Sequence, residues 1–435
     1  MDHGIHASEV LRLNEWAWLG GGGSWSSACD VTAVKRSGSL PSCPRVVLVG
    51  PKPKVIYKSH AARHARHTCR RRPQPDQTPR MTSRVAVRAL TESEYPSWRK
   101  LVAGSPDGSI YASPEYLDAL CAAGGGRYRI LGVFRGEELI GGLPLYEREG
   151  RAGRYVGPRL LLYYLGPVLR DFDTKYPSQR TARQIEALGA LADAVGGAGY
   201  DHVTLKCRHT IEDVRPFLVR GWRAWPSYSY VLRIGDLAAA WGRVEQNLRR
   251  LVDRCASQGI TFAEDEDFTS FYDLHRRTLD RKDAPAYLPE AAFRGLFARL
   301  HAAGLCRLYQ ARLSDGQAIA AQLVLTGAHS LSHTVCAAAD PAHLGTGVNA
   351  FLRWRSLEAL SALGYTGNDL TDAALNPVTH FKSQFGGDLV TCFVLEPPAS
   401  LRWRAVSGAM DALISSRGLA ASAARRVLRR PSCAP

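Results

Sequence analysis

The dipeptide Asp315-Gly316 constrains the fold more than any other feature, because it separates two apolar runs, 305–313 and 319–326. Asp-Gly between apolar runs is the strongest short-range signal of a β-hairpin, since glycine supplies the positive φ that the turn requires. A third apolar run, 330–336, follows after a short loop. The sequence therefore predicts three consecutive antiparallel strands in this region.

A glycine turn that leads directly into a helix follows these strands. Gly345 and Gly347 precede an apolar segment, 348–363, which Gly364 ends. A strand followed by a glycine turn and a helix favours anion binding, because glycine lets the backbone approach a ligand and the first N–H groups of a helix have no internal partner. The same glycines are as typical of a tight turn without a ligand, so both interpretations stay open.

A short motif near the end of the chain carries a family resemblance. The motif at 381–387, Phe-Lys-Ser-Gln-Phe-Gly-Gly, resembles the Phe-Lys-x-x-Phe-Gly-Gly signature of FemAB-like and CelD-like acyltransferases, which belong to the GNAT superfamily. The stretches 247–260 and 164–168 agree with it, and the resemblance covers residues 84–396. It implies an α+β fold of two tandem GNAT-type domains, each a mixed, mostly antiparallel sheet flanked by helices.

The resemblance also implies direct acyl transfer without an acyl-enzyme. In the first half the corresponding turn carries Asp171 and Asp173, which would repel a pyrophosphate, so we expect the donor to bind in the second domain. Backbone N–H groups near Val335 and Ala338 would bind the thioester carbonyl. Ala342 stands where the family's turn has a basic or amide residue, so both acyl-CoA and aminoacyl-tRNA stay open as the co-substrate. The donor phosphates would lie against Gly345, Gly347, Val348 and Asn349.

Four side chains are candidates for catalysis or substrate contact. Lys382 comes first, because a cation within the signature could bind an acceptor phosphate or stabilise developing negative charge. For the base, Asp372 ends a predicted strand, and His380 titrates in the useful range. His333, on the third strand, is a candidate for substrate binding. The structural alternatives are a surface lysine, a cap or surface group, and a packed strand histidine.

The chain is too long for one comfortable core, and its net charge of +16 is unevenly spread. Residues 1–80 hold 13 Lys and Arg against 5 Asp and Glu. We expect them to be a disordered basic leader, with Met81 as the start of the functional protein. Two halves, 81–235 and 236–398, repeat similar turn residues in the same order, which suggests a duplicated fold. A basic tail, 399–435, follows.

Three further elements are predicted, one at the start of the second half and two in the first half. The segment 236–259 has apolar residues spaced for one face of an amphipathic helix. On its polar side, Arg249 and Arg250 are candidates for binding an anionic substrate, or form an ordinary solvated face. In the first half, 160–165 is predicted as an apolar strand, and 210–219 as a short helix.

Composition excludes several classes of protein. No run reaches the roughly 18 uninterrupted apolar residues of a membrane helix. The ten cysteines contain no Cys-x-x-Cys pair, which indicates reduced thiols and neither a zinc site nor a disulfide framework. We therefore expect a cytoplasmic protein without a metal or a tightly bound cofactor. Contact of the basic tail with the anionic inner face of the membrane stays open.

Three functions agree with these observations. The first is transfer of an acyl group from an acyl thioester, such as acyl-CoA, to an amine or hydroxyl of a cell-envelope saccharide or its precursor, as in polysaccharide biosynthesis. The second is transfer from aminoacyl-tRNA to a peptidoglycan precursor, the only alternative with a nucleic-acid partner. The third is a non-catalytic GNAT-fold protein that binds its ligand during polysaccharide assembly.

Overall fold

The computed structural model describes residues 85–159, 161–282, 284, 286 and 288–409. These residues all belong to one compact unit. The expected leader, its boundary at Met81 and the tail beyond residue 409 lie outside the described residues. No described helix combines the length and apolar character that a bilayer crossing requires.

The first half of the described chain builds a six-stranded sheet in the order β1-β2-β3-β4-β6, with β5 paired to β3. Its strands are β1 (Val85–Ala89), β2 (Arg127–Arg135), β3 (Glu138–Gly150), β4 (Gly153–Val156), β5 (Val168–Leu169) and β6 (His202–Val203). All of its pairs are antiparallel except β4 with β6. The helices of this half are η1 (Glu92–Glu94), α2 (Tyr95–Gly104), η2 (Ile110–Ala112), α3 (Pro114–Gly124), α4 (Pro177–Gly196) and α5 (Arg215–Leu218).

The second sheet has eight strands in the order β7-β14-β8-β13-β12-β11-β10-β9. Its strands are β7 (Leu205–Lys206), β8 (Arg223–Arg233), β9 (Thr261–Glu264), β10 (Cys306–Arg312), β11 (Ala318–Leu325), β12 (Leu331–Ala339), β13 (Gly367–Asp369) and β14 (Asp388–Glu396). Only β12 and β13 pair in parallel. The helices are α6 (Leu237–Arg243), α7 (Gln246–Ser257), α8 (Phe268–Arg281), α9 (Glu290–Ala302), η3 (Pro341–Thr346), α10 (Val348–Ala362) and α11 (Pro377–Ser383).

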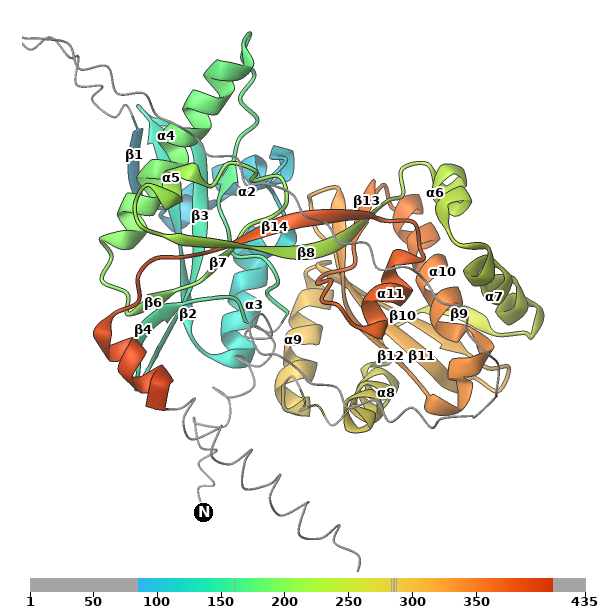
Figure 1. Ribbon diagram of the computed structural model, residues 1–435. Helices are drawn as coiled ribbons and strands as arrows, with labels where there is room; N and C mark the ends of the chain where they lie inside the picture. The colour runs from blue at the N-terminus through green and yellow to red at the C-terminus, as the bar shows by residue number, and fades with distance from the viewer. Residues whose placement is uncertain (1–84, 160, 283, 285, 287, 410–435) are drawn as a thin grey trace, which may run out of the picture. The chain divides into compact units, whose positions relative to one another are not determined.

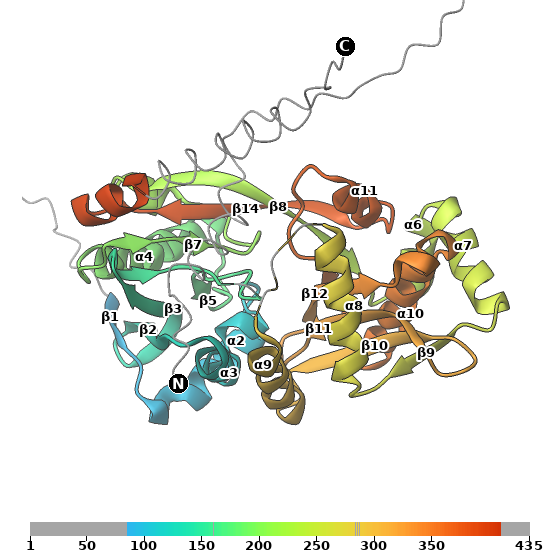
Figure 2. The same cartoon turned by 90° about the horizontal axis from the view of Figure 1, so that it is seen from below.

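Strands from the first half of the chain complete the second sheet. β7 and β8 precede the expected domain boundary at residue 235, yet both pair with β14. β8 also pairs with β13, so it lies between two strands of the second half. β8 and β14 run side by side in both views (Figure 1, Figure 2). The two halves therefore share backbone hydrogen bonds.

Helices cover both faces of the second sheet. On β10, Leu308 packs in the apolar cluster that contains Phe271 of α8 and Phe293 of α9. The next residue, Tyr309, packs in the cluster that contains Leu357 of α10. Because successive strand residues point to opposite faces, α8 and α9 cover one face and α10 covers the other.

The strongest local signals of the sequence correspond to observed elements. Asp315 and Gly316 lie between β10 and β11, which pair antiparallel, and Gly316 has φ +87°. α10 begins directly after Gly347 and ends before Gly364, and both glycines have positive φ. The predicted hairpin, third strand and following helix are therefore confirmed.

Two predicted elements of the first half are wrong, one because it does not form and one because it is shorter than predicted. Residues 161–165 form no strand: Leu161 has φ +65°, which a strand does not adopt, and Leu165 makes only an isolated bridge. In 210–219 only α5 is helical, with Pro216 in its first turn.

The predicted helix over 236–259 is two helices, α6 and α7, because Gln384 holds the chain between them. The N–H of Glu245 donates to the Gln384 carbonyl at 2.9 Å, and the Gln384 side-chain amide donates back to the Glu245 carboxylate at 2.8 Å. Val244, at the break, has an extended ψ of 134°. A long-range contact therefore overrides a local helical pattern.

Candidate functional site

The second sheet opens between its two parallel strands. β12 and β13 pair at only three positions, the last of which joins His333 to Asp369. β12 continues to Ala339, whereas β13 ends at Asp369, so beyond His333 that side of β12 has no strand partner. A cavity of about 260 Å³ lies at this opening.

Residues from helices on both faces of the sheet line the cavity. His275, Thr278 and Leu279 come from α8, whereas Arg353 comes from α10 on the opposite face. A closed sheet separates its two faces, so this shared lining depends on the divergence of β12 from β13. The third helix, α11, contributes Lys382.

A β-bulge turns the middle of β12 toward the cavity. Cys336 pairs with Leu323 and Thr334 with Val324, so Val335 is an extra residue without an opposite partner. Such bulges bend a strand and re-aim its side chains and backbone groups. Of the two residues predicted to mark the donor carbonyl site, Val335 lines the cavity, whereas Ala338 is buried and does not.

Lys382 lies at the edge of this cavity and is half-buried. Its Nζ donates hydrogen bonds to the carbonyl oxygens of Thr371 and, at 2.7 Å, of Asp372. Burial, followed by the positive charge of Arg353, lowers the pKa of Lys382 to about 8, although the Asp372 carboxylate acts in the opposite direction. One N–H of the ammonium group stays available, because an ammonium has three donors.

The backbone that Lys382 holds is strained. Thr371 and Asp372 have φ values of 45° and 58°, which β-branched and other non-glycine residues adopt rarely. Thr371 is fixed further by its N–H, which donates to the Asp369 carboxylate at 2.8 Å, and by its hydroxyl, which donates to the Thr334 carbonyl at 2.7 Å. Strain of this kind persists only where the surroundings enforce it, and it is concentrated at functional sites. The exposed Asp372 side chain lines the cavity.

A buried carboxylate, Asp369, anchors this strained turn. Its oxygens accept hydrogen bonds from Tyr164 Oη at 2.7 Å and from Ser229 Oγ, in addition to the Thr371 N–H. Burial opposes ionisation, but His333 and the hydrogen bonds from Ser229, Tyr164 and Thr371 nevertheless hold the pKa of Asp369 below its usual value. The carboxylate thus links strands of both halves.

His333 lies beside Asp369 and does not line the cavity. It is fully buried, its Nδ1 is 3.7 Å from Asp369 Oδ2, and its ring stacks obliquely on Tyr111 with centroids 4.8 Å apart. Burial lowers the pKa of His333 to about 3, so the ring is neutral near pH 7. These surroundings are those of a packed strand histidine, and its role in substrate binding stays a prediction.

The other predicted site residues do not line this cavity. His380 is exposed on α11, Arg250 is exposed on α7, and Arg249 is half-buried on α7. In the glycine turn, Gly345 is exposed, Asn349 is half-buried, and both Gly347 and Val348 are buried. The structure therefore brings Val335, Asp372 and Lys382 together and leaves the remaining candidates outside the cavity lining.

Gly347 has a packing role that the sequence left open. It has φ +92°, and a Cβ there would lie 2.6 Å from the Cβ of Leu251 on α7. α7 therefore covers this part of the turn, which agrees with the tight-turn interpretation. A role of the turn in binding donor phosphates stays a prediction.

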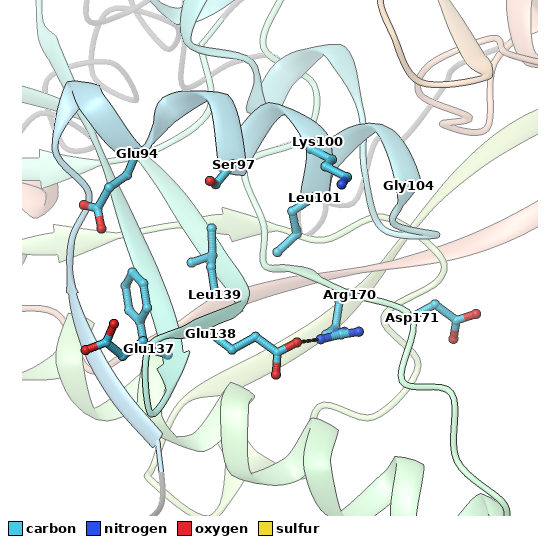
Figure 3. Close-up of a pocket in the computed structure, with 11 residues that line it drawn as sticks. Glu94, Ser97, Lys100, Leu101, Gly104, Glu137, Glu138, Leu139, Arg170 and Asp171 are labelled. Carbon is cyan, nitrogen blue, oxygen red and sulfur yellow. Dashed lines mark hydrogen bonds and ion pairs between the residues drawn. The ribbon is translucent and has the colours of Figure 1, made fainter.

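A wider hollow, of about 590 Å³, lies on the first half beside α2. Figure 3 shows its lining, in which Arg170 and Glu138 are joined in an ion pair. The other charged groups are of both signs: Lys100, Glu137 and Asp171 are exposed, and Glu94 is half-buried. Exposed charges of mixed sign are typical of a solvated surface. No cluster of His, Cys, Asp or Glu that could bind a metal ion occurs among the described residues.

Comparison with known families identifies the part of the chain that carries the cavity. Residues 242–383 match a family model described as an acetyltransferase (GNAT) domain. This segment is therefore similar to a GNAT-type domain. It contains β12, β13 and α10, and it ends one residue after Lys382. The match supports acyltransferase chemistry in general and does not name a donor or an acceptor. None of the curated proteins compared with the chain matches it.

Solved structures extend the likeness beyond the GNAT-type domain. The crystal structure of FemX is 13% identical and has a TM-score of 0.56, with 71% of this chain and 96% of that chain covered. A tandem GNAT protein from the clavulanic acid biosynthesis pathway is 12% identical and has a TM-score of 0.43, with 72% and 97% covered. At these identities the likeness shows the fold alone. The predicted α+β fold class, with two mixed, mostly antiparallel sheets flanked by helices, is confirmed. The division into two tandem GNAT-type domains stays a prediction.

Sequence reasoning missed Arg353, which lines the cavity. In the sequence, Asn349 and Arg353 are four residues apart and would share one polar face of the helix. The sequence therefore carries no signal that Arg353 is buried.

Proposed function

We propose that the chain transfers an acyl group directly from an acyl thioester, such as acyl-CoA, to an amine or hydroxyl of a cell-envelope saccharide or its precursor. The observation that carries this proposal is the cavity between β12 and β13, which Lys382 of the FemAB-like signature borders. The envelope acceptor rests on the resemblance of that signature. The GNAT family match supports the transfer of an acyl group.

Direct transfer requires a positioned donor carbonyl, a stabilised oxyanion and a group that takes up the proton of the acceptor. The donor carbonyl would lie beside the bulge at Val335, where β12 has no strand partner. The remaining N–H of Lys382 would donate to the oxyanion. Asp372, exposed at the cavity rim, would take up the proton of the acceptor, with His380 as the alternative base.

The packing of Leu251 against Gly347 favours a donor other than CoA. CoA would need the turn around Gly347 for its pyrophosphate, and Leu251 packs against that glycine. A donor without a pyrophosphate at this position, such as aminoacyl-tRNA, does not need the turn. The aminoacyl-tRNA-dependent reaction on a peptidoglycan precursor is therefore the second proposal. A non-catalytic binding protein is the third, and the test separates it from both.

The test is a thermal-shift series with acetyl-CoA, a long-chain acyl-CoA and charged tRNA. A ligand that binds only the folded state raises Tm, by an amount equivalent to about 2.7 kcal/mol when its concentration is 100 times Kd. We expect a shift with one donor class, and acyl transfer from that donor when envelope precursors are added.

Lys382→Met should abolish transfer while the donor still binds. Arg355→Met is the matched control, since Arg355 is exposed on α10 and pairs with Glu358 at 2.7 Å. Binding of a donor without turnover by the wild type on any envelope acceptor would favour the binding protein. Equal turnover in Lys382→Met would refute the assigned role of this lysine.

A further inference from the structure

A buried cation without a protein partner faces the cavity. Arg353 is only 5% exposed, and its Nε and Nη1 atoms are buried without a hydrogen-bond partner. Among the described residues its guanidinium makes no hydrogen bond and no ion pair. It makes one distant cation–π contact, with its central carbon 5.9 Å from the centroid of the Phe385 ring. A buried charge is normally paired, so this arrangement points to a ligand.

The charges around Arg353 leave the cavity positive. The basic and acidic side chains that line it are His275, Lys282, Arg353, Asp372 and Lys382. Burial, followed by the charge of Lys282, lowers the pKa of His275 to about 4, so it is neutral near pH 7. Asp372 faces Lys382 and, as the only acidic side chain in the lining, offsets one cation. An anion in the cavity would therefore meet an excess of positive charge.

The size of the cavity and the type of cation narrow the ligand. About 260 Å³ is below the usual range for a whole small-molecule site, so the cavity holds one end of a substrate. Guanidinium is planar and presents its donors in a fork that matches a carboxylate with two parallel hydrogen bonds. Two of the three N–H groups of Lys382 already donate to backbone carbonyls, so Arg353 is the main donor left for a ligand. A single guanidinium matches a ligand with one negative charge better than a phosphate dianion.

We propose that Arg353 binds a carboxylate of the substrate within this cavity, next to the position of the reacting carbonyl. Which substrate molecule contains this carboxylate is a question that rests on the proposed acyl transfer. The carboxylate belongs either to the acyl group of the donor, as in a dicarboxylic monothioester, or to an amino-acid acceptor. Binding of a free carboxylate does not depend on that transfer and tests the site alone.

The first experiment measures binding of glutarate, propionate and inorganic phosphate to the full chain by calorimetry and thermal shift. We expect the two carboxylates to bind to the wild type and to Arg355→Met, and their affinity to fall about ten- to hundredfold in Arg353→Met. Arg353→Lys should retain part of the affinity. Without ligand, Arg353→Met should be at least as stable as the wild type, because it removes an unpaired buried charge.

Any one of three results would overturn the proposal. The first is that neither carboxylate binds to the wild type. The second is that phosphate binds through Arg353 and the carboxylates do not. The third concerns the proteins without ligand: Arg353→Met is much less stable than the wild type, and Arg353→Lys restores stability but binds no carboxylate. That result is the behaviour of a structural arginine.

The second experiment separates the two sources of the carboxylate. Glutaryl-CoA is compared with valeryl-CoA of the same chain length, and an amino-acid acceptor is compared with its amide. Preference for the charged member of one pair, lost in Arg353→Met, supports the proposal and assigns the carboxylate to donor or acceptor. Equal use of all four by the wild type would contradict it. If no donor binds and glutarate still binds through Arg353, the transferase proposal fails and the carboxylate site stands.

Discussion

Replacement of Lys382 by methionine should change how the free energy of unfolding depends on pH. Lys382 has a pKa of about 8 in the folded protein, against 10.5 for an ordinary lysine. Between these two values the unfolded chain binds a proton that the folded chain has released. Stability therefore rises with pH across this window, and the cost of burying the charged lysine is fully present below about pH 8.

The magnitude follows from the shift. A difference of about 2.5 units corresponds to about 3 kcal/mol, since each unit is worth 1.36 kcal/mol. The two hydrogen bonds from Nζ to Thr371 and Asp372 also add to the free energy of unfolding of the wild type, and Lys382→Met loses this contribution. The free energy of unfolding of the wild type minus that of Lys382→Met should therefore increase by about 3 kcal/mol between pH 7.5 and pH 10.5.

The assay is denaturant unfolding of both proteins at half-unit steps of pH. Groups that titrate in both proteins cancel in the difference, so it isolates Lys382. Lys100→Met, which removes an exposed lysine of α2, is the matched control. In an Arg353→Met background the rise should begin at higher pH, because the charge of Arg353 contributes to the low pKa of Lys382. A difference that stays flat within about 1 kcal/mol for Lys382→Met would refute the reasoning.

Two further predictions concern residues that hold the site in place. Asp369→Asn leaves fewer acceptor atoms for the buried hydrogen bonds from Tyr164, Ser229 and the Thr371 N–H, so denaturant unfolding at pH 7 should show a loss of about 1–3 kcal/mol; an unchanged free energy of unfolding would contradict the anchoring role of this carboxylate. Gly347→Ala places a Cβ 2.6 Å from Leu251 at a residue with φ +92°, so we expect a loss of about 1–3 kcal/mol. Gly345→Ala, where nothing lies within 4 Å of the added Cβ, is its control and should change stability by less than about 1 kcal/mol; equal effects of the two would contradict the packing role of Gly347.

The sequence predicted those elements whose cause is local. Gly316, Gly347 and Gly364 each have positive φ, and each marks an observed turn or helix boundary. Lys382 of the motif also lies within the segment that matches the GNAT family model. Local backbone preferences and a short signature were sufficient for these features, because no distant segment determines them.

The rest depended on contacts between distant segments. The insertion of β8 between β13 and β14 joins strands more than 130 residues apart, and no period or turn residue encodes that pairing. The buried position of Arg353 depends on which strands diverge beneath α10. The prediction of one helix over 236–259 was wrong because Gln384, far along the chain, binds Glu245 at the break.

Most of the signature at 381–387 has a structural explanation that is independent of catalysis. Phe385 is buried, with its ring 5.2 Å from that of Phe381. A Cβ on Gly386 would lie 2.5 Å from the backbone oxygen of Arg243, at the end of α6, so only glycine allows that approach. Gln384 fixes the break between α6 and α7.

These roles decide what the signature can imply about function. The two phenylalanines, the glutamine and Gly386 specify how α11 packs against α6, α7 and the second core. Within the motif, Lys382 alone lines the cavity, and Arg353, which lies outside the motif, lines it too. Under the two proposals above, we therefore expect the motif to specify the architecture of the site and the residue at position 353 to specify its ligand. Substitutions at that position are the ones that should change substrate preference without changing the fold.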